Sequence, residues 1–207
     1  MKKIFSLLMV VLLTLTISSF AMAEDDMIEG EDYFIYEGSG DDFIEIDKPE
    51  DAALLKISGN AEGRYFGVQG VNDQNENTQL FVNTTSIYDG IRPMDFDGSN
   101  TTMLEIEAPG EWRIGVFPVG WARSIDEVPG ELSGTGDEVF LVWDGDSASR
   151  AYIEGNTQER YFGVVSWYER SELLVNTTQE YSGTVRLRQT PFAIEVEATG
   201  DWYIRFE

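Results

Sequence analysis

Carboxylates are the most abundant groups in this chain that could carry out acid–base chemistry. The sequence holds 38 aspartate and glutamate residues but no histidine and no cysteine. Nucleophilic sites of the Ser-His-Asp or Cys-His type are therefore excluded, as are zinc sites with imidazole or thiolate ligands. The remaining acid–base chemistry is that of a carboxylate pair, as in glycoside hydrolysis.

Glu105 and Glu107 form the most regular carboxylate pair. They alternate with the apolar residues of the segment 104–108, so both side chains are expected on the outer face of one strand, in water. The same pattern predicts that Glu195 and Glu197 face water as well. Nothing around these pairs predicts the apolar pocket that would raise one pKa. We therefore predict that the chain is not an enzyme, with a carboxylate-dependent glycan hydrolase as the alternative.

Two loops carry the hard oxygen ligands that calcium takes. Asp95, Asp97 and Asn100 lie in one loop, and Asp144 and Asp146 lie in the other, with the one-three spacing of calcium loops. Neither loop has the full EF-hand pattern, and the same residue types form ordinary turns through local hydrogen bonds. Calcium is the only cofactor that the sequence leaves open, and otherwise none is expected.

Aromatic side chains are the second group with binding chemistry. Period-two alternation points Phe162 inward, so Tyr161 and Trp167 point outward, as Trp143 does in an earlier strand, and Tyr168 lies beside them. Flat rings on a sandwich face can hold a sugar or dock a protein. The alternative is that the linker or another domain covers this face, since large exposed apolar patches are rare on monomers.

The charge of the chain narrows its partners. The formal net charge is −24 at pH 7, and the only lysines beyond residue 3 are Lys48 and Lys56. Nucleic acids and anionic lipid surfaces are bound through positive faces, so neither is expected as a partner. An extracellular polysaccharide or protein remains open.

Residues 1–23 have the features of an export signal. Lys2 and Lys3 are followed by the apolar run Ile4 to Leu15 and by Ala21-Met22-Ala23, an A-x-A cleavage site. The apolar run is shorter than the roughly 20 residues that span a bilayer. We predict a secreted protein, extracellular or in the cell envelope, with no membrane insertion after cleavage; a retained anchor is the alternative.

The elements that must position these residues occur twice. Gly59–Val68 returns as Gly155–Val164, and Leu104–Ile114 returns as Ile194–Ile204. Each copy has turn signals between short alternating segments, which predicts about seven strands per copy. The predicted fold class is all-β, with two tandem antiparallel β-sandwich domains of about seven strands each.

The repeat sets the expected domain boundaries. They are a signal peptide at 1–23, a leader at 24–37, a first sandwich at 38–117, a linker at 118–133 and a second sandwich at 134–207. Trp121 lies in the linker, and because a tryptophan is unfavourable in water, we expect it to pack at the junction of the domains.

The repeated blocks resemble a known domain. They are Gly38–Asp42 and Gly134–Glu138, the Leu-x-Val-Asn segments, Tyr181–Val185 and Ala198–Ile204. Together they resemble a β-sandwich domain of many secreted bacterial and archaeal proteins that has no assigned activity. The resemblance covers nearly all of both copies and implies secretion, but it brings no catalytic residues. At the level of the fold, the strand count is also similar to that of prepeptidase C-terminal domains.

The two copies differ in two places that bear on function. The first copy has Gly90-Ile91-Arg92 where the second has Gly183-Thr184-Val185. Trp143 and Trp167 stand where the first copy has Asp47 and Val71. A function on the outer aromatic face would therefore belong to the second domain.

These observations predict a secreted, non-catalytic binding module for a cell-envelope or extracellular polymer or protein. The alternatives are the carboxylate-dependent hydrolase and a purely structural envelope protein. A cleft with two carboxylates beside Trp143 or Trp167 would favour the hydrolase. A flat, exposed aromatic strip would favour binding.

Overall fold

The computed structural model describes residues 33–207, and these form almost only β-strands. The predicted signal peptide and most of the predicted leader lie outside the described residues. Within residues 33–207, no helix has the length and apolar character needed to cross a membrane. The all-β prediction is confirmed.

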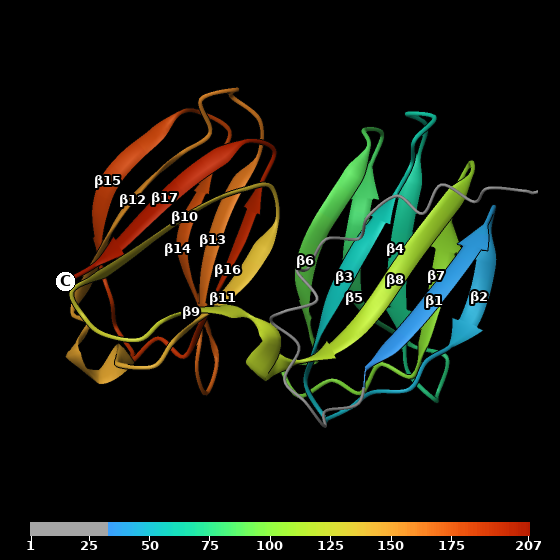
Figure 1. Cartoon of the computed structure of the whole chain (residues 1–207), viewed down its shortest axis with the longest axis horizontal. Helices are drawn as coiled ribbons and strands as arrows, with labels where there is room; N and C mark the ends of the chain where they lie inside the picture. The colour runs from blue at the N-terminus through green and yellow to red at the C-terminus, as the bar shows by residue number, and fades with distance from the viewer. Residues whose placement is uncertain (1–32) are drawn as a thin grey trace, which may run out of the picture.

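The first sandwich packs two four-stranded antiparallel sheets against each other (Figure 1). One sheet has the order β1 (Phe34–Ser39), β8 (Glu111–Pro118), β3 (Ala53–Gly59), β6 (Tyr88–Met94). The other has the order β2 (Asp42–Glu45), β7 (Met103–Glu107), β4 (Phe66–Val71), β5 (Asn77–Thr84).

The second sandwich repeats this strand order and adds one strand. Its four-stranded sheet has the order β10 (Gly130–Thr135), β17 (Asp201–Phe206), β12 (Arg150–Gly155), β15 (Tyr181–Arg186). Its five-stranded sheet has the order β14 (Ser171–Thr177), β13 (Phe162–Trp167), β16 (Ala193–Ala198), β11 (Glu138–Val142), β9 (Arg123–Ile125). The short strand β9 joins β11 in parallel, while every other pairing is antiparallel.

The predicted leader and linker are not free of strands, which corrects the expected boundaries and strand count. β1 begins at Phe34 and pairs with β8, and β9 and β10 lie within or across the predicted linker 118–133. β10 has Leu132 as its only large apolar residue, so alternation could not reveal it. These strands are specified by the partner edges that they complete, and each sandwich has at least eight strands.

The inward positions of the repeated blocks form two separate cores. Trp112 and Trp202 are buried, as alternation predicts. Each indole N–H donates to a glycine carbonyl, that of Gly40 or Gly136, at 3.0 Å. The preceding glycine, at 38 or 134, lies directly against the indole ring, where a Cβ would come within 2.2 or 2.3 Å of it. This close approach explains the glycine spacing of the repeated blocks.

The two sandwiches meet at the outer face of the five-stranded sheet, where β6 of the first lies next to β11 of the second (Figure 1). An apolar cluster fills this junction. Its buried members are Leu54, Phe117, Val119, Val139, Leu141 and Ala193. Trp121 packs against the cluster, with its ring centroid 4.7 Å from that of Phe117, so its predicted place at the junction is confirmed.

Candidate functional site

A buried arginine lies at the centre of the junction. Arg92, on β6, is 7% exposed and reaches three carboxylates of the second domain. Its Nη2 lies 2.9 Å from Oε1 of Glu195, and its Nη1 lies 2.9 Å from Oε2 of Glu197 and 3.4 Å from Oδ2 of Asp137. The prediction that Glu195 faces water is therefore wrong, because the first domain covers this part of the sheet and leaves Glu195 6% exposed.

The neighbours of Arg92 on β6 complete the contact. The Ile91 amide donates to the backbone oxygen of Asp137 at 2.9 Å. The Tyr88 hydroxyl donates to Oδ2 of the same aspartate at 2.7 Å. Gly90 lies so close that a Cβ there would come within 2.9 Å of the Asp137 Cβ. The segment in which the first copy departs from the repeat is thus the segment that touches the second domain, and this departure was the available sequence signal for the junction.

The charges at the junction are unequal, with three carboxylates around one guanidinium. Burial raises the pKa of Glu195 and Asp137, although Arg92 acts in the opposite direction on both. Burial alone would lower the pKa of Arg92. Its three carboxylate partners together raise that pKa by more than burial lowers it, so the guanidinium stays charged. Burial and the nearby Asp137 also raise the pKa of Tyr88.

Glu195 is the carboxylate beside Trp167, the arrangement that would favour a hydrolase. Its Oε2 accepts the indole N–H of Trp167 at 3.0 Å, and its Oε1 is paired with Arg92. Both oxygens are therefore engaged within the protein. A general acid must present its proton to the leaving group, so Glu195 would have to release one of these partners to act as one.

The structure separates the four aromatic residues that the sequence grouped as ligand-binding candidates. Trp167 is partly buried in the junction, edge-on to Phe96 at 5.9 Å between ring centroids. Tyr161 is 43% exposed and lines a groove between the domains. Trp143 and Tyr168 are 58% and 54% exposed, at one end of the five-stranded sheet. The alternative that the first domain covers this face therefore holds for Trp167 and not for the other three.

Phe192 joins Trp143 and Tyr168 to form what we call the aromatic rim. Trp143 follows β11, Tyr168 follows β13 and Phe192 precedes the antiparallel β16, so all three lie at the same end of the sheet. The rings of Trp143 and Phe192 are 6.3 Å apart and nearly perpendicular, and Phe192 is 38% exposed. Sequence reasoning missed Phe192; its signal was the exchange of Thr102 in the first copy for a phenylalanine.

The backbone holds the rim in place. The Phe192 amide donates to the oxygen of Trp167 at 2.9 Å, and the Phe192 oxygen accepts from the Val142 amide at 2.9 Å. These bonds extend the ladder by one residue before β16, to the last residues of β13 and β11. Phe192 is therefore carried on ordered backbone that continues the sheet.

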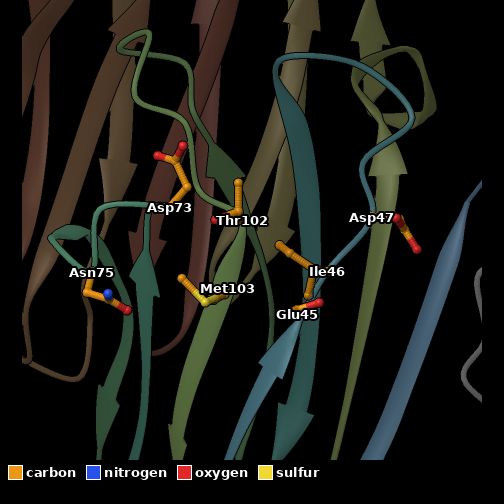
Figure 2. Close-up of a pocket in the computed structure, with 7 residues that line it drawn as sticks. All are labelled: Glu45, Ile46, Asp47, Asp73, Asn75, Thr102 and Met103. Atoms are coloured by element: carbon orange, nitrogen blue, oxygen red, sulfur yellow. The ribbon is translucent and has the colours of Figure 1, made fainter.

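The corresponding end of the first domain holds a polar pocket in place of rings. The pocket has a volume of about 640 Å³ and lies between the end of β2, the loop after β4 and the start of β7. Figure 2 shows the residues that line it. Its lining is Glu45, Ile46, Asp47, Asp73, Asn75, Thr102 and Met103. Asp47, the counterpart of Trp143, points away from the others (Figure 2). The same end of the fold is thus acidic in one domain and aromatic in the other.

The first predicted calcium loop is closed by a lysine. Lys48 Nζ lies 2.7 Å from Oδ2 of Asp95 and 3.1 Å from Oδ1 of Asn100. Asp95 is buried, and its Oδ1 also accepts the Thr101 hydroxyl at 2.7 Å. The Ser99 hydroxyl donates to Asp97, which lowers the pKa of that carboxyl. The ammonium group of Lys48 thus lies against the side-chain oxygens of this loop.

The second predicted calcium loop is a turn tied by hydroxyl groups. Asp144 accepts the Ser147 hydroxyl at 2.8 Å, and Asp146 accepts the Thr190 hydroxyl at 3.1 Å. Among residues 33–207, no three histidine, cysteine, aspartate or glutamate side chains gather closely enough to hold a metal ion. Calcium binding stays a prediction for both loops.

Comparison with known proteins identifies no family. No protein-family model matches the chain, and no curated protein matches its sequence. Solved structures that align with it include the regulatory subunit of a cAMP-independent protein kinase A from Trypanosoma cruzi bound to guanosine, at 8% identity and a TM-score of 0.25, covering 84% of this chain and 72% of that one. Another is cAMP-bound PfPKA-R (141–441), at 8% identity and a TM-score of 0.22, covering 84% and 70%. TM-scores this low do not indicate a shared fold.

Proposed function

We propose that the chain is a secreted, non-catalytic module of two tandem sandwich domains that binds an extracellular or cell-envelope polysaccharide through the aromatic rim of its second domain. The observation that carries this proposal is the rim itself: Trp143, Tyr168 and Phe192 are each more than one third exposed at one end of a single sheet. Exposed apolar groups that gather in one place mark interaction sites more often than those scattered singly.

Polar groups beside the rim favour a sugar as the ligand. Asp146 and Thr190, hydrogen-bonded to each other, lie in the segments next to Trp143 and Phe192. A sugar presents an apolar C–H face that packs on aromatic rings and a border of hydroxyls that need hydrogen-bond partners, and ligand sites combine apolar surface with a few such polar groups. The rim and its border offer both.

Charge and the N-terminal sequence support the remaining parts of the proposal. The net charge of −24 disfavours nucleic acid and anionic lipid as the ligand. The charged and apolar segments of residues 1–23 support export. The engagement of both Glu195 oxygens supports a non-catalytic role.

Retention on insoluble polysaccharides tests the proposal. Residues 24–207 would be mixed with cellulose, chitin, xylan and whole peptidoglycan, and the bound fraction measured as a function of protein concentration. We expect retention on at least one polymer and a loss of at least tenfold in affinity for Trp143→Ala and Tyr168→Ala, because each removes a stacking surface.

Phe43→Ala is the matched control. Phe43 is also more than one third exposed, on the equivalent sheet of the first domain, but it lies away from the rim. Retention should match that of the unaltered chain. If no polymer retains the chain, or if the rim variants bind as tightly as the Phe43 variant, the proposal is wrong.

A further inference from the structure

A groove runs along the junction beside Arg92. Two adjoining hollows of about 270 Å³ each share Tyr161 and Glu197 in their lining. The wall on one side is β5 of the first domain, and the wall on the other is β13 and β16 of the second. The groove exists only where the two domains meet, and it lies apart from the rim residues.

Tyr161 forms a fixed platform in this groove. A Cβ placed on Gly163 would lie 2.9 Å from the Tyr161 hydroxyl oxygen and 3.1 Å from a ring carbon. The ring therefore lies over Gly163, an arrangement in which an aromatic side chain covers a strand glycine. One side of the ring is packed on the strand, and the tyrosine remains 43% exposed to the groove.

Two polar groups flank the platform. Glu197 pairs through Oε2 with Arg92 Nη1, yet 43% of its side chain stays exposed, so it can accept a further hydrogen bond. The Nε–H of the buried Arg92 has no acceptor among residues 33–207, although both of its terminal nitrogens are paired. This nitrogen has almost no accessible surface, so a ligand in the groove does not reach it in this structure.

We propose that the groove binds one sugar unit of an uncharged saccharide. The sugar packs its C–H face on Tyr161 and donates a hydroxyl to Glu197. An uncharged ligand fits because three carboxylates, those of Asp137, Glu195 and Glu197, surround a single guanidinium, and an anionic sugar would be repelled. The inference takes its ligand class from the proposed function but depends on different residues.

The first domain carries the same platform without the groove. Tyr65 lies over Gly67 as Tyr161 lies over Gly163, with a Cβ-to-hydroxyl distance of 2.8 Å, and it is 45% exposed. No other domain within the described chain packs on this face, so no arginine reaches it. Tyr65 is therefore a matched control that differs from Tyr161 in its surroundings and not in its own geometry.

An array of neutral and acidic oligosaccharides, followed by calorimetric titration of the best neutral glycan, tests the proposal. We expect residues 24–207 to bind neutral glycans in preference to acidic ones. Tyr161→Ala should weaken binding at least tenfold, and Gly163→Ala should do the same by displacing the ring. Tyr65→Ala should bind as the unaltered chain does, and thermal unfolding of each variant shows whether it is folded.

Trp143→Ala separates this inference from the proposed function. A short oligosaccharide in the groove should still bind to this variant, whereas retention on the polymer should fall. Equal binding by the Tyr161 and Tyr65 variants, or tighter binding of acidic glycans, would overturn the groove site and leave the rim intact. If Trp143→Ala abolishes binding of the short oligosaccharide and Tyr161→Ala does not, the groove site is likewise overturned. If no glycan and no polymer binds, both proposals fail.

Discussion

The outer sheet faces of the two domains share a backbone plan and differ in what they meet. β2 pairs with β7 in the same register as β11 pairs with β16, so Glu45 corresponds to Leu141 and Glu105 to Glu195. Glu45 and Glu105 are exposed on the first domain, whereas Leu141 and Glu195 are buried against it. The docked face and the solvated face thus differ in their outward side chains and share the inward pattern.

Glu105 and Glu195 show that surroundings decide the behaviour of a side chain that the repeat preserves. Each is an outward glutamate on the strand before the buried tryptophan. Only Glu195 is paired with Arg92, and burial raises the pKa of Glu195. The comparison teaches that the acids of the junction have counterparts in both copies, whereas the arginine on β6 is present in the first copy alone.

The largest expected effect follows from removing that cation. Arg92→Met leaves the carboxylates at the junction without their partner, and breaking a buried ion pair from one side costs about 3–5 kcal/mol. Chemical unfolding should show this loss, and small-angle scattering should show domains that separate. Arg113→Met removes an arginine that pairs with Glu37 at the surface of the first domain, and it should cost under about 1 kcal/mol. Equal costs would contradict a structural role for Arg92.

Exchanging the corresponding residues Glu45 and Leu141 tests the faces directly. Leu141→Glu loses the burial of a leucine, which alone is worth about 1.5–3 kcal/mol, and it places a further carboxylate at the junction. The domains should separate rather than unfold, because separation returns the charge to water, and scattering combined with unfolding measures both. Glu45→Leu should change the free energy of unfolding by no more than about 0.5 kcal/mol, since it lies at the surface. A Leu141→Glu chain that stays docked would refute this account of the junction.

The stability of the chain should depend on pH through Glu195 and Asp137, with a smaller effect than the substitutions above. The folded-state pKa of Glu195 and of Asp137 is raised by burial, so these groups bind protons more tightly in the folded chain. Their contribution to stability is full below the ordinary carboxyl pKa of about 4 and is lost as pH rises through the raised values. Thermal unfolding between pH 4 and 8 measures this trend.

Substitution isolates the source of the trend. Glu195→Gln should flatten the dependence on pH, because it removes one of the two groups whose pKa is raised. Asp97 has the opposite sign, because the Ser99 hydroxyl lowers its pKa and its contribution is lost only as pH falls below the ordinary value. A Glu195→Gln curve that parallels the unaltered chain would show that the junction does not bind the protons.

The smallest effect on stability is expected at the rim. Trp143→Asp gives the second domain the side chain of the first domain at this position, and as a surface change it should alter the free energy of unfolding by less than about 0.5 kcal/mol. Polysaccharide retention should nevertheless fall at least tenfold. The reverse change, Asp47→Trp, should leave retention on the polysaccharide unchanged. The pocket beside Asp47 has no aromatic residue in its lining, so the new tryptophan would have no ring to act with. Restored binding through Asp47→Trp in a Trp143→Asp chain would show that the rest of the rim is dispensable.

Repetition made the fold largely predictable from the sequence. Alternation placed Trp112 and Trp202 in the cores correctly, and the shared blocks identified two sandwiches. β1 and β10 were missed because their own side chains carry a weak pattern and their partner strands specify them. Local sequence describes which face of a strand is apolar, but it does not describe which edge a short polar strand will complete.

The candidate sites were only partly predictable, because they depend on the docking of one domain on the other. Trp143 and Tyr168 were expected to be exposed and are, but Trp167 has a partner that only the fold supplies. Glu195 was assigned to water because its strand pattern matches that of Glu105. The Gly90-Ile91-Arg92 departure carried the missing information, and it needed the structure to show what it touches.

The docking of the two sandwiches has a polarity. The first domain offers the edge strand β6, with its arginine, and the second offers a sheet face. At the matching place on the edge strand β15, the second domain has Val185, which packs against its own core and cannot reach outward. The two domains therefore contribute different surfaces to the contact, and the second domain has no arginine at the position that matches Arg92. A further sandwich that docked on the β2–β7–β4–β5 sheet of the first domain in the same way would have to supply its own arginine.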